Sequence, residues 1–197
     1  MPVLKTQKDF RKVNGLPFCY FCGEPFNNSI ERTRDHVPPK SIFLPEDRTP
    51  PLILNAHNKC NCEQSYADNE IGQLINILHD KIPAKKNKIL RFGLYKGDDG
   101  TINSLINLDL EGIIFRWIRG FHAALYHEYL LIPRLRKVHA PIVSAIKDGT
   151  KIIGEPIQGQ QLIFVDAIKK NRKAENVDKI ISNNGKCKYE CVWYKMH

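Results

Sequence analysis

The sequence predicts an α+β fold in which a metal-stabilised ββα module at the N-terminus precedes a mixed α/β accessory domain. Closely spaced cysteine and histidine pairs lie on either side of two predicted strands, and a predicted helix follows the second pair. Beyond that helix, one strongly apolar helical segment is followed by short strand-like segments. We therefore predict a module at residues 1–82 and an accessory domain at residues 83–197.

The composition allows an ordinary hydrophobic core and predicts no membrane span. The chain has 197 residues, of which 42% are hydrophobic. It contains no apolar run near the roughly 18 residues that cross a bilayer. The opening segment 1–5 leads into further charged residues rather than the apolar region of a secretory signal. We therefore expect a cytoplasmic protein without a membrane partner.

The charge balance favours a polyanionic partner. Thirty Lys and Arg residues against twenty-one Asp and Glu residues give a net charge of +9, which attracts nucleic acid through counterion release and long-range steering. The basic runs at 81–96 and 169–173 fit that partner, but each is equally explained as a solvated face or linker.

The N-terminal half contains the predicted module. Residues 1–15 lack clear periodicity and are expected to form a frayed lead-in, with or without a short helix. Residues 30–37 predict a strand that ends at two prolines, and a second strand is predicted at 52–54 after a loop at 44–51. From about residue 60 to 79, apolar residues recur at helical spacing and predict one apolar face: Ile71, Leu74, Ile75 and Leu78.

The C-terminal half predicts further elements of both kinds. A basic linker at 83–88 leads to a helix over roughly 110–131, which Pro133 ends or kinks. Residues 138–147 suggest another helix. Strands are predicted at 151–153, 161–165 and 187–193, the last from its alternation of half-buried and polar positions.

The cysteine and histidine pairs predict a structural zinc site. Gly23 permits the tight turn after the first pair, and two residues three apart at a helix start share one face. Four soft ligands close a tetrahedral site. The ligand set is Cys19, Cys22, His57 and Cys60. Competing sets use Cys62 with Cys60 or borrow Cys187 and Cys191, and a further alternative is that these residues are buried free thiols.

Two further features accompany these pairs: the dipeptide Asp35-His36 followed by Val37-x-Pro39, and Asn61 directly after Cys60. Together with the pairs, they make the segment 18–70 resemble the HNH endonucleases of the ββα-metal superfamily. The resemblance implies a metal-dependent endonuclease that hydrolyses phosphodiester bonds, with DNA as the expected substrate.

The resemblance also assigns roles to three residues. His36 is expected to be the general base that activates water. Asp35 and Asn61 are expected to bind one catalytic Mg²⁺ or Mn²⁺ ion through oxygen ligands. Neighbours in a strand point to opposite faces, so a distortion before Pro38 is predicted to bring Asp35 and His36 into one cleft.

The chain departs from the family pattern at one position. The family usually has a middle Asn that orients the base histidine. At the corresponding positions this chain has Pro50 and Pro51, and the nearest residue with a side-chain amide is Asn55. The alternative function is therefore a catalytically weak or inactive, zinc-stabilised nucleic-acid-binding protein. Arg32, Arg34 and Lys40 are predicted to contact phosphates or to be ordinary surface charge.

Overall fold

The α+β class is confirmed in the computed structural model, which describes residues 3–27, 32–78, 92–96, 102–106, 109–131, 144–147, 150–153 and 177–192. The described helices are α1 (Gln7–Val13), α2 (Asn58–Leu78) and α3 (Leu110–Tyr126), with short 3-10 turns at Lys40–Ile42 and Pro45–Asp47. The described strands are β1 (Val3–Leu4), β2 (Arg32–His36), β3 (Ile53–His57), β4 (Phe92–Lys96), β5 (Ile102–Ile106), β6 (Ser144–Lys147), β7 (Thr150–Ile153), β8 (Val177–Ser182) and β9 (Cys187–Val192).

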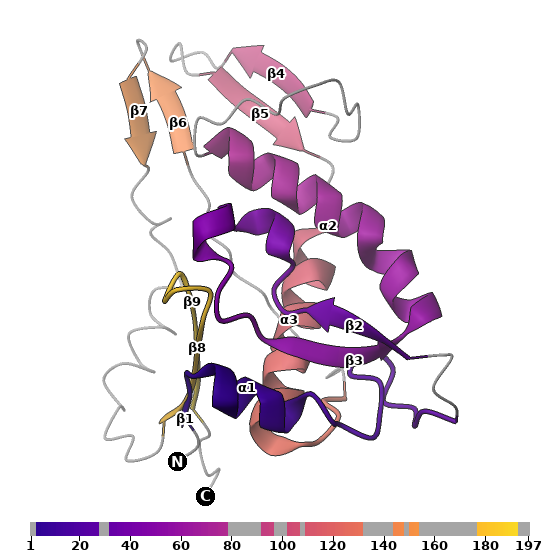
Figure 1. The fold of residues 1–197 in the computed structure, drawn as a ribbon. Helices are drawn as coiled ribbons and strands as arrows, with labels where there is room; N and C mark the ends of the chain where they lie inside the picture. Colours follow the sequence, from indigo (N-terminus) through magenta and orange to yellow (C-terminus); the bar gives the residue numbers. More distant parts are fainter. Residues whose placement is uncertain are drawn as a thin grey trace, which may run out of the picture.

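These strands form three sheets with the orders β1-β8-β9, β2-β3 and β4-β5-β6-β7. Figure 1 shows β1 beside β8, although the two strands come from opposite ends of the chain. Among the described residues, no helix combines the length and apolar character needed to cross a membrane.

The predicted strand-strand-helix order is confirmed in the N-terminal half. Strands β2 and β3 pair antiparallel, from Arg32 opposite His57 to His36 opposite Ile53. Helix α2 begins at the residue after β3 and contacts both strands. Its residues Ile71 and Leu74 are buried, as the apolar spacing predicted.

The expectation of a frayed lead-in is wrong for residues 3–15, whereas the short helix that it allowed is present as α1. Helix α1 begins with a capping box, in which the Thr6 side chain accepts from the Asp9 backbone and the Asp9 carboxylate accepts from the Thr6 backbone. Phe10 is fully buried in the main core. Strand β1 pairs in parallel with β8, placing Val3 opposite Lys179. A buried aromatic and a long-range strand partner therefore fix this segment.

Helix α3 belongs to the same core as the N-terminal elements. The Asp109 side chain caps its first turn by accepting from the Gly112 backbone, and His127, in the left-handed conformation at φ 57°, ends it earlier than predicted. The main buried cluster joins Phe121 of α3 to Leu54 of β3 and Phe10 of α1. This core thus draws on both sides of the predicted boundary at residues 82 and 83, and the division into domains stays a prediction.

The later elements follow the sequence only in part. The prediction of a helix at 138–147 is wrong for residues 144–147, because these form strand β6, which pairs with β7. Asp-Gly is a dipeptide preferred in two-residue hairpin turns, and its presence at 148–149 in the sequence is the signal that favours a hairpin over a helix here. Strands β7 and β9 confirm the predictions at 151–153 and 187–193, whereas the predicted linker at 83–88 and strand at 161–165 lie outside the described residues.

We predict that Gly120→Ala destabilises the protein, although alanine is the better helix former. A Cβ at this position of α3 would lie 2.6 Å from Cγ1 of Val37 and 3.3 Å from Cε2 of Tyr20. Overpacking costs about 1–3 kcal/mol, and an approach of 2.6 Å to the fully buried Val37 side chain puts this site in the upper part of that range. Helix propensity returns about 1 kcal/mol, so a net loss of about 1–2 kcal/mol is expected in urea unfolding.

Gly15→Ala is the matched control, because a Cβ there meets nothing within 4 Å. It should change the free energy of unfolding by less than about 0.5 kcal/mol. Unchanged stability in Gly120→Ala would contradict the close packing of α3 against Val37 and Tyr20.

Candidate metal centre

The first cysteine pair lies in a tight turn held by its own backbone. The Gly23 N–H donates to the Cys19 carbonyl at 2.8 Å, and the Cys19 N–H donates to the Glu24 carbonyl at 2.9 Å. Gly23 has φ 82°, a left-handed conformation that glycine adopts without steric cost. The turn therefore lets the thiols of Cys19 and Cys22 approach one point.

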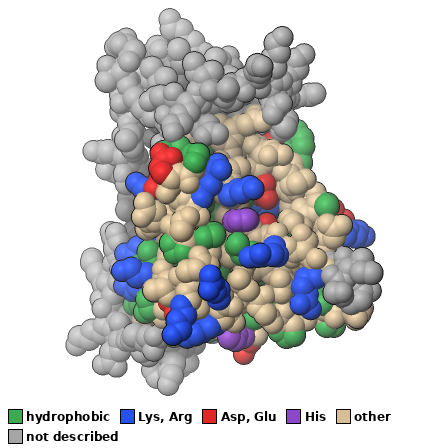
Figure 2. Space-filling view, in the orientation of Figure 1, with side chains coloured by type: hydrophobic (Ala, Val, Ile, Leu, Met, Phe, Trp, Pro, Cys, Tyr) green, Lys and Arg blue, Asp and Glu red, His purple; other side chains and the backbone are tan. Residues whose placement is uncertain are grey.

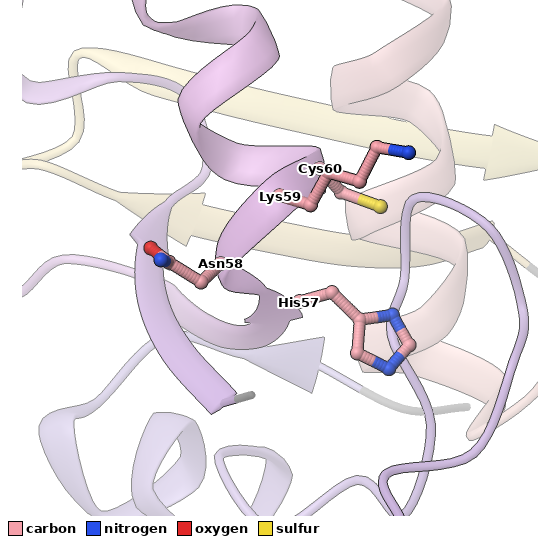
Figure 3. Close-up of a pocket in the computed structure, with 4 residues that line it drawn as sticks. All are labelled: His57, Asn58, Lys59 and Cys60. Atoms are coloured by element: carbon pink, nitrogen blue, oxygen red, sulfur yellow. The ribbon is translucent and has the colours of Figure 1, made fainter. Parts of the chain in front are cut away.

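The second pair lies where β3 passes into α2. His57 is the last residue of β3, and Cys60 is in the first turn of the helix. Figure 3 shows the His57 ring and the Cys60 sulfur projecting to the same side, while Asn58 points away. These residues and Lys59 line a surface hollow of about 290 Å³.

The two pairs meet in one Cys₃His cluster. One ligand atom from each of Cys19, Cys22, His57 and Cys60 lies within 4.8 Å of the others. The Sγ of Cys22 lies 3.4 Å from Nδ1 of His57, and the His57 backbone N–H donates to the Sγ of Cys19 at 3.2 Å. Three sulfurs and one imidazole at this spacing could hold a structural metal ion such as zinc.

The competing ligand sets are not assembled. Cys62 is exposed, and its thiol donates to Oδ1 of Asn58 at 3.5 Å. Cys187 and Cys191 lie in β9, outside the cluster. All six cysteines are free thiols in the structure.

Burial favours the protonated form of the Cys19 and Cys60 thiols when no ion is bound. Desolvation raises the pKa of Cys19, and it raises the pKa of Cys60 to about 12 together with the neighbouring thiols. Thiols bind metal as thiolates, so an incoming cation displaces these protons.

Asp35 is buried, with 8% of its surface exposed. The Tyr20 hydroxyl donates to its Oδ2. Burial raises the pKa of Asp35, while the Tyr20 hydrogen bond, the charge of Arg116 and the His36 backbone N–H oppose that rise. The carboxylate thus faces a polar environment within the core.

No bulge interrupts strand β2, and the Val37–Pro38 peptide bond that follows it is cis. The β2–β3 register runs without a bulge through His36, and the Val37 N–H continues it by donating to the Leu52 carbonyl at 3.0 Å. Since hydrogen-bonded pairs alternate, the His36 N–H faces the outer edge of the hairpin, where it helps to lower the pKa of the Asp35 carboxyl. Asp35 and His36 are thus neighbours in a regular strand, and their meeting in one cleft stays a prediction.

His36 is half-buried at the end of β2. Burial lowers its pKa first, and the positive charges of Lys40, Arg34 and Arg48 lower it further. The imidazole is therefore predominantly neutral at neutral pH, which is the form that accepts a proton. On the face shown in Figure 2, Lys and Arg side chains lie on several sides of a histidine.

The two asparagines named from the sequence differ in their surroundings. Asn61 follows Cys60 in α2 and is partly exposed, and its joint binding of an ion with Asp35 stays a prediction. Asn55 is buried, and its Nδ2 donates to the Asn14 carbonyl at 2.6 Å. Asn55 is thus engaged with the end of α1.

Sequence reasoning missed Tyr20, whose hydroxyl donates to Asp35, and the buried pair of Asp68 and Arg116, whose charges interact with that of Asp35. Arg116 of α3 forms an ion pair with Asp68 of α2, and their side chains are 5% and 17% exposed. The available signal was a charged residue within the most apolar helical segment of the chain.

Comparison of the chain with protein-family models, with curated proteins and with solved structures found no significant match. The site is therefore interpreted from its own residues.

We predict that the purified protein contains about one zinc ion per chain. Cys60→Ser should lose the metal and lower the unfolding temperature, because a hard hydroxyl replaces a thiolate ligand. Cys62→Ser, two residues along the same helix, should retain both the metal and the stability. Elemental analysis and thermal unfolding measure these outcomes; equal zinc in the two variants would contradict the ligand set.

Zinc affinity should fall as the pH falls. Because the thiol pKa values are raised, protons compete with the metal throughout the neutral range. The affinity should drop by roughly tenfold per pH unit for each thiol that regains its proton. Competition with a chromogenic chelator between about pH 8 and pH 6 measures the slope, and a flat profile would contradict thiolate ligation.

Proposed function

We propose that this protein is a metal-dependent endonuclease that hydrolyses phosphodiester bonds in nucleic acid, with DNA as the substrate. The Cys₃His cluster carries the proposal. It joins the turn that carries Cys19 and Cys22 to the point where β3 passes into α2. Asn61 directly follows the cluster residue Cys60, and Asp35 and His36 lie on the strand paired with β3.

In this proposal His36 removes a proton from water. The resulting hydroxide attacks the phosphorus, and the bond to the leaving sugar oxygen breaks. A Mg²⁺ or Mn²⁺ ion, when bound, would neutralise the charge that develops on the phosphate oxygens. Asp35 and Asn61 offer the oxygen ligands that such an ion prefers. The lowered pKa of His36 supports the base role.

The charge around His36 supports a polyanionic substrate. Arg34, Lys40 and Arg48 each act on the imidazole through their positive charge. The net charge of +9 has the same sign, and lysine and arginine side chains spread over the face in Figure 2. Phosphate contacts of this kind position a strand without reading its sequence.

One observation favours a second candidate, a zinc-stabilised nucleic-acid-binding protein without catalysis. The position of the family's middle Asn is taken by Pro50 and Pro51, and the nearest amide, Asn55, donates to the Asn14 carbonyl. A base histidine without an orienting amide would be less well placed to accept a proton.

Cleavage of supercoiled plasmid in Mg²⁺ or Mn²⁺ tests the two candidates. The wild type should nick or cut the plasmid, and His36→Ala should lower the rate by about 10²- to 10⁴-fold, the usual contribution of a general base. Zinc content should not change. His127→Asn is the matched control, because His127 is exposed at the end of α3 and asparagine tolerates its left-handed backbone.

Cleavage that survives in His36→Ala would refute its role as the base. Salt-sensitive binding of DNA without cleavage in either metal would instead select the binding protein.

A further inference from the structure

Two side chains from a distant part of the chain bind one backbone carbonyl of the cysteine turn, residues 19–23. Nη1 of Arg119, in α3, donates to the Phe21 carbonyl at 2.8 Å, and the hydroxyl of Tyr129, just beyond the helix, donates to the same oxygen at 3.4 Å. The guanidinium also lies over the Tyr129 ring, with Cζ 5.6 Å from the ring centroid. This cation–π contact restrains both donors, so the carbonyl is held from a fixed direction.

The Phe21 carbonyl belongs to the same peptide group as the N–H of Cys22, one of the four candidate ligands. That peptide bond is trans, and in a planar trans peptide the carbonyl and the N–H point in opposite directions. The donors on one side therefore direct the Cys22 N–H to the other side of the turn. Burial raises the pKa of Cys19, and the Cys22 N–H is among the groups that oppose this rise.

The residue that follows Cys22 is held as well. The Tyr129 ring lies so close to Gly23 that a Cβ there would be 2.7 Å from its Cδ1. The Gly23 N–H closes the turn by donating to the Cys19 carbonyl at 2.8 Å. Both neighbours of Cys22 along the chain are thus in contact with Arg119 or Tyr129, although neither side chain is among the candidate ligands.

We propose that Arg119 and Tyr129 are positioning residues of the metal centre: through the backbone on either side of Cys22, they hold its thiol in the ligating position before an ion arrives. Binding to a site that is already arranged costs less ordering of the chain, so the ion is held more tightly. This inference goes beyond the proposed function, because it needs the Cys₃His site but not the nuclease activity.

Competition between the full chain and a chromogenic chelator for Zn²⁺, at one fixed pH, tests this role. Arg119→Met keeps an apolar stem but removes every donor. It should weaken Zn²⁺ binding by about 10- to 100-fold, the usual effect of losing a residue that orients a metal ligand. Arg119→Lys restores a donor and should recover part of the affinity.

Co²⁺ bound in place of zinc provides a spectroscopic readout, because its visible absorption reports the geometry of the thiolate ligands. The spectrum of Arg119→Met should differ from that of the wild type, and the spectrum of Arg119→Lys should return toward it. A side chain that only stabilised α3 would change the amount of folded protein and leave the spectrum of the bound ion as it is.

Tyr126→Phe is the control for a general loss of stability in α3. The Tyr126 hydroxyl donates to Oδ2 of Asp178 in β8 at 2.6 Å, away from the cysteine turn. This variant should bind Zn²⁺ as the wild type does. If Arg119→Met does not fold, Tyr129→Leu removes both the second donor and the ring beside Gly23, and it should weaken Zn²⁺ binding in the same direction.

The outcomes separate this inference from the proposed function. Wild-type Zn²⁺ affinity in Arg119→Met, or an equal loss of affinity in Tyr126→Phe, would overturn the positioning role. If Arg119→Met does not fold, wild-type affinity in Tyr129→Leu would overturn it equally. A wild type that binds no Zn²⁺ would overturn the metal centre and this inference with it. Plasmid that stays intact while the Zn²⁺ affinities change as expected would count against the nuclease activity alone.

Discussion

The meeting of two cysteine and histidine pairs at one point is the constraint on which the N-terminal half depends. Between Cys22 and His57 the chain forms the β2–β3 hairpin and its connecting segments, and the Cys₃His cluster brings the two ends of this stretch together. Closing such a loop costs conformational entropy, which a metal ion shared by the four ligands would offset. Because His57 ends β3 and Cys60 lies in the first turn of α2, an ion shared by the cluster would also restrain how the helix leaves the hairpin.

Helix α3 provides the second support, and it comes from far along the chain. The Arg119 side chain donates from Nη1 to the Phe21 carbonyl within the cysteine turn at 2.8 Å. Gly120 allows α3 to approach Val37, and the Tyr129 ring lies where a side chain at Gly23 would be. A short segment of this kind has little core of its own. This helix supplies the missing cover for both the cysteine turn and the end of β2.

The sequence predicted those elements whose signals are local. The pair spacing, the prolines after His36 and the helical recurrence of Ile71 and Leu74 each act within a turn or two of chain, and the structure confirms a hairpin and a helix there. The first residues were misjudged because Phe10 is held by tertiary contacts that no local pattern reveals. The segment at 144–147 was misjudged because helix and strand are hard to separate in a short apolar run.

The sequence by itself determined the four candidate ligands and the strand-strand-helix order around them, since ligand chemistry and backbone spacing are properties of short segments. Only the tertiary structure decided the surroundings of the Asp35 carboxylate. The Tyr20 hydroxyl reaches it from the cysteine turn, and the charges of the Asp68–Arg116 pair act with it from α2 and α3. The structure also decided that Asn55 faces Asn14. Such meetings depend on long-range packing, which residue spacing along the chain does not encode.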